Sequence, residues 1–156
     1  MKLSLVTVGK VRDRHLASCI ESYAKRLRSS ASFRVTEVKE ARGAATRALR
    51  QERESAALLA EVPRGAVTVA LDERGVSWRS VELAERMERS AVRGRGHWVF
   101  LLGGADGHTA NLRETCDHVW SLSPLTFPHE LCRLLVTEQL YRAVTIQRGE
   151  PYHRED

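Results

Sequence analysis

The chain has little cysteine and no close cysteine pairs. Its 156 residues contain only Cys19, Cys116 and Cys132, at intervals much longer than those of a zinc site or a redox dithiol. We therefore expect buried, reduced thiols and no bound metal. No apolar run approaches the roughly 18 residues of a membrane helix, and the first ten residues lack the features of a secretory signal. The sequence thus predicts a cytoplasmic protein that does not contact a membrane.

Two common phosphate-binding motifs are also missing. Gly103, Gly104 and Gly107 do not follow the G-x-G-x-x-G spacing of a dinucleotide site, and no Lys-Ser or Lys-Thr completes a phosphate-cradling loop. Conspicuous acidic metal ligands are absent as well. These absences disfavour a nucleotide-binding oxidoreductase or phosphotransferase.

What the chain does contain is the composition of an ordinary globular protein, with 42% hydrophobic and 29% charged residues. The formal net charge is +5. A mild excess of base favours an anionic partner such as a nucleic acid, although many housekeeping enzymes have a similar balance. The charge alone therefore decides little.

Apolar runs of strand length alternate with helix-like segments, which is the pattern of an α/β sheet with helices on its faces. The expected strands are residues 3–8, 33–38, 66–71, 97–102 and a short strand ending near Trp120. The expected helices are residues 15–27, 44–60, 80–92 and 129–146.

Local patterns add detail to this outline. The imperfect alternation of residues 33–38 is typical of an edge strand, Asp72-Glu-Arg-Gly75 is turn-like, and Ser80 can serve as a helix N-cap. No internal repeat, low-complexity segment or convincing linker divides the chain. We expect a single domain over residues 1–156.

Two loops are candidates for a binding site. Gly103-Gly-Ala-Asp-Gly107 directly follows an apolar strand, and ligands of parallel α/β sheets lie beyond the carboxyl ends of the strands. A tight turn that needs positive φ is the alternative. Leu122–Phe127 combines the hydroxyls of Ser123 and Thr126 with a backbone restricted by proline, which suits a rigid ligand loop or, alternatively, the start of a helix.

The last expected helix, residues 129–146, has apolar residues over more than half of its circumference. One core contact cannot cover that surface, and a second copy of the chain is the simplest additional cover. A central helix in a monomer is the alternative. Arg142 lies four residues after Glu138 and is expected to pair with it, although a role in substrate binding is also open.

Five segments together carry a resemblance to a known family. They are Met1-Lys-Leu3, Leu71-Asp72, Leu102-Gly-Gly-Ala-Asp-Gly107, Trp120-Ser-Leu-Ser-Pro-Leu-Thr-Phe-Pro-His129 and Pro151-Tyr-His-Arg154. In this order and at this chain length, the sequence resembles the SPOUT-class methyltransferases that modify large-subunit ribosomal RNA. The resemblance covers essentially the whole chain, although residues 42–61 and Ala105-Asp106 give no residue-level match.

The resemblance implies an α/β knot, that is, a mostly parallel sheet flanked by helices with a carboxyl-terminal trefoil knot. It also implies a homodimer that uses S-adenosyl-L-methionine to methylate N3 of a pseudouridine in helix 69 of 23S ribosomal RNA. The substrate would be the assembled 70S ribosome, with no DNA partner. A non-catalytic, ribosome-associated RNA-binding factor is the alternative function.

The resemblance further assigns residues to roles. It implies cofactor contacts at Leu71, Gly103, Leu122, Ser123, Pro124, Leu125, Thr126 and Phe127. His129, His153 and Arg154 are the candidates for catalysis, because an imide N3 must lose its proton during methyl transfer. Arg142, Tyr152, His153 and Arg154 are the candidates for RNA binding, because tyrosine stacks on bases while arginine and histidine meet phosphates.

Overall fold

The computed structural model describes residues 1–154, which form one five-stranded sheet with the strand order β2-β1-β4-β3-β5. The strands are β1 (Lys2–Val8), β2 (Ser32–Val38), β3 (Val67–Ser77), β4 (His97–Leu102) and β5 (His118–Ser121). Every neighbouring pair is parallel. The carboxyl ends of all strands therefore point to one edge of the sheet, which we call the carboxyl edge, and their amino ends to the opposite, amino edge.

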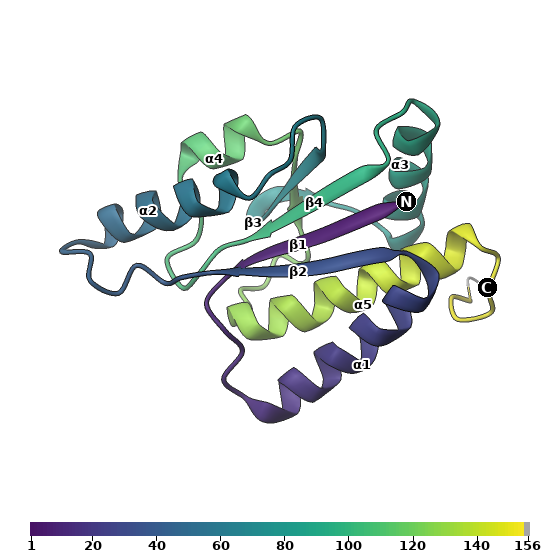
Figure 1. Ribbon diagram of the computed structural model, residues 1–156, viewed down its shortest axis with the longest axis horizontal. Helices are drawn as coiled ribbons and strands as arrows, with labels where there is room; N and C mark the ends of the chain where they lie inside the picture. The colour runs from purple at the N-terminus through teal and green to yellow at the C-terminus, as the bar shows by residue number, and fades with distance from the viewer. Residues whose placement is uncertain (155–156) are drawn as a thin grey trace.

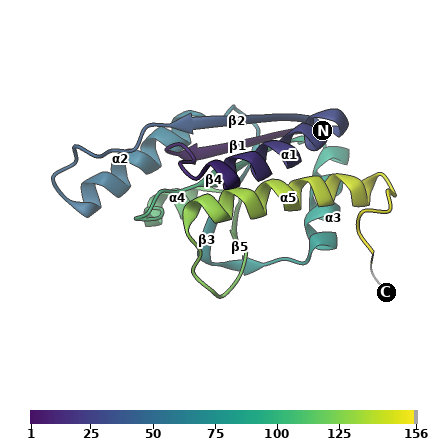
Figure 2. The ribbon, with the colours of Figure 1, turned by 90° about the horizontal axis from the view of Figure 1, so that it is seen from below.

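Helices cover both faces of this sheet. They are α1 (Arg14–Ser30), α2 (Arg47–Ala60), α3 (Ser80–Val92), α4 (Ala110–Thr115) and α5 (His129–Gln147). Helices α1 and α5 lie side by side on one face, whereas α2 and α4 lie on the other (Figures 1 and 2). The expected parallel α/β sheet with flanking helices is thus confirmed, as is the edge position of β2.

Strand β4 shows how the sequence builds two cores. Trp98, Phe100 and Leu102 join the apolar cluster that contains residues of α1, α3 and α5. Val99 and Leu101 alternate with them and join the cluster that contains Leu58 of α2 and Leu112 of α4. A strand buried on both faces needs a continuous apolar run, which residues 97–102 nearly provide.

Helix starts are set by side chains that accept backbone hydrogen bonds. Thr46 Oγ1 accepts from the Leu49 amide at 3.1 Å, so α2 begins three residues later than expected. The prediction that Ser80 caps α3 is wrong. Arg79 is the N-cap residue, with its amide bonded to Glu82 Oε2 at 2.7 Å, and the Ser80 hydroxyl donates instead to Gln139 Oε1 of α5.

The predicted turn at Asp72–Gly75 is also wrong, because β3 continues to Ser77. Strand β5 pairs with β3 on both sides of an irregularity between Leu71 and Val76. Gly75 lies so close to β5 that a Cβ atom there would be 2.5 Å from the Val119 carbonyl oxygen. The glycine therefore permits a bulge within a strand, where the sequence pattern suggested a chain reversal.

The three cysteines are free, as expected, but they are not uniformly buried. Cys116 and Cys132 are half-buried, whereas Cys19 is exposed on α1. The expectation of burial is therefore wrong for Cys19, which faces away from the core that its neighbour Ile20 enters.

None of the helices within residues 1–154 is long and apolar enough to cross a membrane. The trefoil knot and the single-domain organisation stay predictions. Glu155 and Asp156, which the predicted domain includes, lie outside the described residues.

Leu140 of α5 provides a test of this core because its side chain is fully buried. Leu140→Ala removes apolar contacts and leaves a cavity, so we expect the free energy of unfolding to fall by about 2–5 kcal/mol. Urea denaturation followed by circular dichroism measures the change. Val92→Ala, at a side chain that is 84% exposed, is the control and should change stability by less than about 0.5 kcal/mol. Equal effects of the two substitutions would contradict the packing described.

Candidate functional site

A cavity of about 320 Å³ lies at the carboxyl edge. Three neighbouring strands line it, because Leu71 of β3 pairs in register with both Leu102, at the end of β4, and Trp120, near the end of β5. The Trp120 ring stacks on Trp78, with the ring centroids 5.5 Å apart. The volume lies within the range of about 300–1,000 Å³ that is typical of small-molecule sites.

Both loops that the sequence singled out meet at this cavity. The loop after β4 contributes residues 103–107, and the loop after β5 contributes residues 122–123 and 125–127. Seven of the eight expected cofactor residues line the cavity, namely Leu71, Gly103, Leu122, Ser123, Leu125, Thr126 and Phe127. Pro124 is not among the lining residues. The fold thus brings together segments that are about twenty residues apart in the sequence.

Gly103 lies directly against a buried histidine. A Cβ atom at this position would be 3.2 Å from Cε1 of His108, whose side chain is almost completely buried. The Nε2 atom of His108 lies 3.1 Å from the carbonyl oxygen of Leu101, and because a carbonyl only accepts, this nitrogen carries the proton. Burial lowers the pKa of His108. The ring is therefore neutral near pH 7, and it packs against Gly103 without placing a charge beside the loop.

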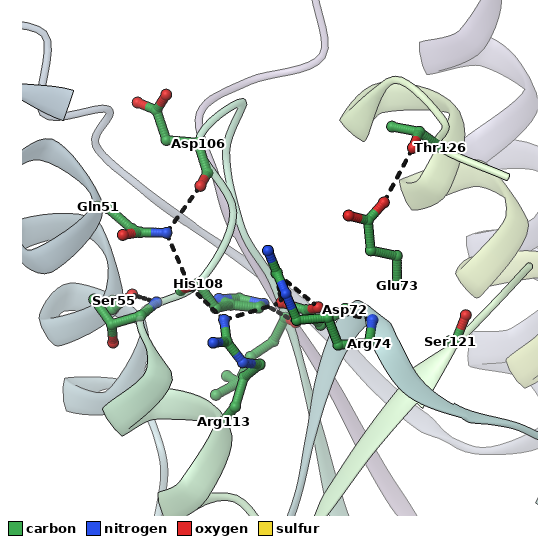
Figure 3. Close-up of polar contacts among 12 residues, drawn as sticks. Gln51, Ser55, Asp72, Glu73, Arg74, Asp106, His108, Arg113, Ser121 and Thr126 are labelled. Atoms are coloured by element: carbon green, nitrogen blue, oxygen red, sulfur yellow. Dashed lines mark hydrogen bonds and ion pairs between the residues drawn. The ribbon is translucent and has the colours of Figure 1, made fainter. Parts of the chain in front are cut away.

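Helix α2 fixes the same loop from the other side (Figure 3). Gln51 Nε2 donates to the carbonyl oxygens of Asp106 at 3.0 Å and His108 at 2.9 Å. Ser55 Oγ accepts from the Thr109 amide at 3.1 Å. Two side chains one helical turn apart thus satisfy consecutive parts of the loop backbone, and they restrain the glycines that face the cavity.

Asp72 connects this loop to the middle of β3. Its carboxylate, 5% exposed, accepts from Arg74 Nη1 at 3.2 Å and from Arg113 Nη1 at 3.3 Å. Arg113 also donates to the His108 carbonyl oxygen at 2.7 Å (Figure 3). One buried carboxylate and one arginine of α4 therefore hold the two sides of the cavity at a defined distance.

The second loop is tied to β3 as well. Thr126 Oγ1 donates to Glu73 Oε2 at 3.0 Å (Figure 3). Within the loop, the Leu125 amide donates to Ser123 Oγ, and Ser121 Oγ donates to the Ser123 carbonyl oxygen. The hydroxyls of Ser123 and Thr126, which the sequence suggested for ligand binding, thus form hydrogen bonds that stabilise the conformation of the loop.

His129, the first residue of α5, lines the cavity too. It also lines a second cavity of about 360 Å³, which shares Gly104, Ala105 and Asp106 with the first. The two cavities therefore adjoin at His129. Among residues 1–154, no cluster of three or more His, Cys, Asp or Glu side chains could hold a metal ion.

The carboxyl-terminal tail packs against the far end of α5. Tyr152 donates a hydrogen bond to Glu138 Oε1 at 2.9 Å, and the Arg142 guanidinium lies over its ring at 4.8 Å. Burial, with hydrogen bonds to Tyr23 and Glu138, raises the pKa of Tyr152. Tyr152 and His153 are half-buried, whereas Arg154 is exposed.

Arg142 is engaged within the chain. Its Nε atom donates to Glu138 Oε1 at 3.0 Å, so the expected ion pair is confirmed, and its Nη1 atom lies 3.3 Å from His153 Nδ1. Hydrogen bonding to Glu138 raises the pKa of Arg142. The guanidinium therefore attaches the tail to α5 together with the hydrogen bond from Tyr152 to Glu138.

The three residues expected to act in catalysis do not meet within one chain. His129 begins α5, and His153 and Arg154 follow its end. At 1.5 Å per residue, the 19 residues of α5 separate its two ends by about 27 Å. His129 lies with the cofactor loops at the carboxyl edge, whereas the tail lies near the amino edge (Figure 1).

Three comparisons place this chain among known proteins. A family model described as "Predicted SPOUT methyltransferase" matches residues 1–153. Two relatives named "Ribosomal RNA large subunit methyltransferase H" are each 44% identical to the chain. The relative from Anaeromyxobacter sp. (strain Fw109-5) aligns over 99% of this chain and 100% of its own length, and the one from Gloeobacter violaceus over 98% and 99%.

Solved structures support the fold independently. A probable methyltransferase from Bordetella pertussis Tohama I superposes with a TM-score of 0.57 at 15% identity, covering 92% of this chain and 96% of that chain. A probable methylase family protein from Haemophilus influenzae Rd KW20 superposes with a TM-score of 0.54 at 12% identity, covering 98% and 70%. The sheet and its site define an α/β methyltransferase fold. The chain belongs to the SPOUT methyltransferase family, within the group of the ribosomal RNA large subunit methyltransferase H proteins.

Gln51 was not suggested by the sequence, yet its amide holds two carbonyls of the cavity loop. Gln51→Glu preserves the size of the side chain but removes the donor, so we expect it to destabilise the loop as Gln51→Ala does, by about 1–3 kcal/mol. Hydrogen exchange of the amides of residues 103–109 measures the local loss. Glu52→Gln, on an exposed neighbour in α2, is the control and should leave exchange unchanged. Unchanged exchange in both Gln51 variants would show that the loop does not depend on this contact.

Proposed function

We propose that this chain transfers the methyl group of S-adenosyl-L-methionine to N3 of a pseudouridine in helix 69 of 23S ribosomal RNA, on the assembled ribosome. Such an enzyme acts in the cytoplasm and needs neither a membrane nor DNA. The observation that carries the proposal is the cavity at the carboxyl edge, which seven of the eight expected cofactor residues line. The printed names of the relatives support the choice of large-subunit ribosomal RNA.

The cavity suits adenosylmethionine by its chemistry. This cofactor carries a sulfonium and an ammonium group but no phosphate, which agrees with the missing phosphate motifs. Leu71, Leu122 and Phe127 offer apolar walls for the adenine, and backbone groups of the glycine loop are accessible beside them. The cavity lining carries the carboxylates of Asp72, Glu73 and Asp106 and the guanidinium groups of Arg47 and Arg74, so its charge is nearly balanced and does not oppose a cationic ligand.

Methyl transfer also needs a group that takes a proton. When bound, adenosylmethionine supplies an electrophilic methyl group, and the carbon–sulfur bond breaks as the bond to N3 forms. The residues of this chain must orient the uracil ring, accept the N3 proton and stabilise the negative charge on the ring. His129 lines the cavity and can accept the proton. His153 and Arg154 can stabilise the charge, and Arg154 with Tyr152 can hold the RNA.

Arg142 then contributes mainly by positioning. Its donors already engage Glu138, and its guanidinium covers the ring of Tyr152. Holding the tail in this way keeps His153 and Arg154 close to the end of α5. A direct RNA contact by Arg142, as first expected, would require that these bonds break.

A homodimer would bring the separated residues together. Leu131, Leu134 and Leu135 remain half-buried on one face of α5, although α1 and α3 flank the helix. A second copy can cover this face, and if the two α5 helices run antiparallel, the tail of one protomer comes near His129 of the other. Each active site would then contain the cofactor loops of one protomer and the tail of its partner.

The proposed reaction is tested with ribosomes from cells that lack this protein. After incubation with the enzyme and adenosylmethionine, mass spectrometry of the helix 69 fragment should show one added methyl group, located on a pseudouridine. Gly103→Val places a larger side chain against His108 at the cofactor loop and should abolish the product, provided that its thermal unfolding remains cooperative. An unchanged fragment mass with the natural enzyme would overturn the proposal. Calorimetry that detects no cofactor binding would favour the non-catalytic RNA-binding factor.

The shared active site is tested by mixing two inactive proteins. The Gly103→Val variant keeps its tail, and a chain that ends at Glu150 keeps its cofactor cavity. We expect each to be inactive alone, whereas co-expression should restore about a quarter of the activity, since half of the dimers are mixed and each has one complete site. The truncated chain should still bind adenosylmethionine in calorimetry. No recovery from correctly mixed dimers would mean that the tail does not act on its partner.

A further inference from the structure

A group of exposed cations follows the first two strands at the carboxyl edge. Lys10, Arg12 and Arg14 lie between β1 and the first turn of α1, and Lys39 and Arg42 lie in the segment after β2. These segments leave the sheet at the same edge (Figure 1). We call these five residues the basic edge.

The carboxylates near the basic edge do not neutralise it. Glu40 is shared by two arginines, since its Oε1 lies 3.3 Å from Arg12 Nη2 and its Oε2 lies 2.6 Å from Arg42 Nε. Both guanidinium side chains remain more than 60% exposed. One negative charge between two positive charges leaves an excess of base that faces solvent.

The other acids nearby are occupied by backbone groups. Asp13 caps α1 by accepting from the amides of His15 and Leu16. Glu130 accepts from the amides of Arg12 and Asp13, which ties the loop after β1 to the first turn of α5. Within residues 1–154, Lys10, Arg14 and Lys39 form no ion pair. These three charges therefore remain available to a partner.

The basic edge adjoins the site described above. Arg12, Arg42 and Arg50 line the second cavity, and this cavity shares His129 with the first. Four carboxylates line it too, so the excess of base lies outside the cavity, on the exposed side chains of the basic edge; they are those of Glu40, Glu54, Asp106 and Glu130. A chain that extends outward from the proposed methyl-transfer site past His129 therefore meets the basic edge first. Flexible cations beside a nucleotide site suit the regularly spaced negative charges of a sugar–phosphate backbone.

We infer that the basic edge binds the phosphodiester backbone of the RNA next to the target nucleotide. This inference rests on the proposed function and adds to it a docking surface formed by the loop after β1, the first turn of α1 and the segment after β2, remote from the tail of the same chain. The arginines and lysines bind phosphates and read no base, so they contribute affinity and orientation while the cavity and the tail select the nucleotide.

The test compares matched charge removals at the two edges of the sheet. One variant carries Lys10→Gln and Arg14→Gln, and another carries Lys39→Gln and Arg42→Gln. The control carries Arg64→Gln and Arg93→Gln, which remove two exposed arginines from the loops before β3 and β4, at the amino edge. All three proteins lose the same net charge, so a nonspecific decrease in electrostatic attraction to the RNA affects them equally.

Binding to unmethylated ribosomes is measured over a range of salt concentrations. For each basic-edge variant we expect the slope of log K against log salt to decrease in magnitude by about 1 to 2, because each lost phosphate contact removes about 1. The control should keep the natural slope, and the adenosylmethionine affinity should be unchanged in every protein.

Equal slopes in all variants would overturn the inference, and so would an equal decrease in the control. A basic-edge variant that binds an acidic protein of the ribosome less well, but naked helix 69 RNA as well as before, would also overturn it. If the slopes change as expected while the natural protein adds no methyl group, the docking surface stands and the proposed function fails.

Discussion

The parallel pairing of all five strands is the constraint on which the site depends. Because each strand runs in the same direction, Leu71, Leu102 and Trp120 lie side by side in register, and the loops that follow β4 and β5 leave the sheet at one edge. An antiparallel neighbour would send one of these loops to the opposite edge. Apolar burial on both faces stabilises the parallel arrangement, so the residues that fold the protein also determine where its cavity forms.

The pairing of strands does not by itself give the loops a shape. Gln51 and Ser55 of α2 and Arg113 of α4 bind the backbone of residues 106–109, at the end of the glycine loop, and the buried His108 bonds to the Leu101 carbonyl of β4 just before it. Most of these contacts use side chains to satisfy main-chain groups, which restrains the loop while leaving other amides and carbonyls free to face the cavity. Helices α2 and α4 thus support the site without lining most of it.

Much of the fold could be predicted from the sequence because its signals are local. Strands β1 and β4 have apolar runs that need burial on both faces, and the periodicity of α5 predicted that helix to within a residue. The two cavity loops could also be identified, since each directly follows a buried strand. The resemblance to the methyltransferase family, which the comparisons confirm, then joined them into one site.

Other features depend on contacts that have no local signal. Gln51 lies more than fifty residues from the carbonyls it holds, and nothing in the pattern of α2 distinguishes it from other polar residues. The bulge at Gly75 looks like a turn until β5 is known to pair beside it. Likewise, Ser80 resembles a helix cap, but its hydroxyl is taken by Gln139 of a helix much later in the chain.

The length of helix α5 fixes where the tail lies relative to the cavity. The first residue of the helix lies at the cavity and Arg142, in its second-last turn, anchors the tail, so the number of residues between them sets both a distance and a direction. Inserting a single residue would lengthen the helix by about 1.5 Å and rotate the tail by about 100°. Apolar side chains along α5 can be exchanged for one another at modest cost. The length of this helix is therefore under tighter constraint than its composition, and insertions that surface loops would accept should be excluded here.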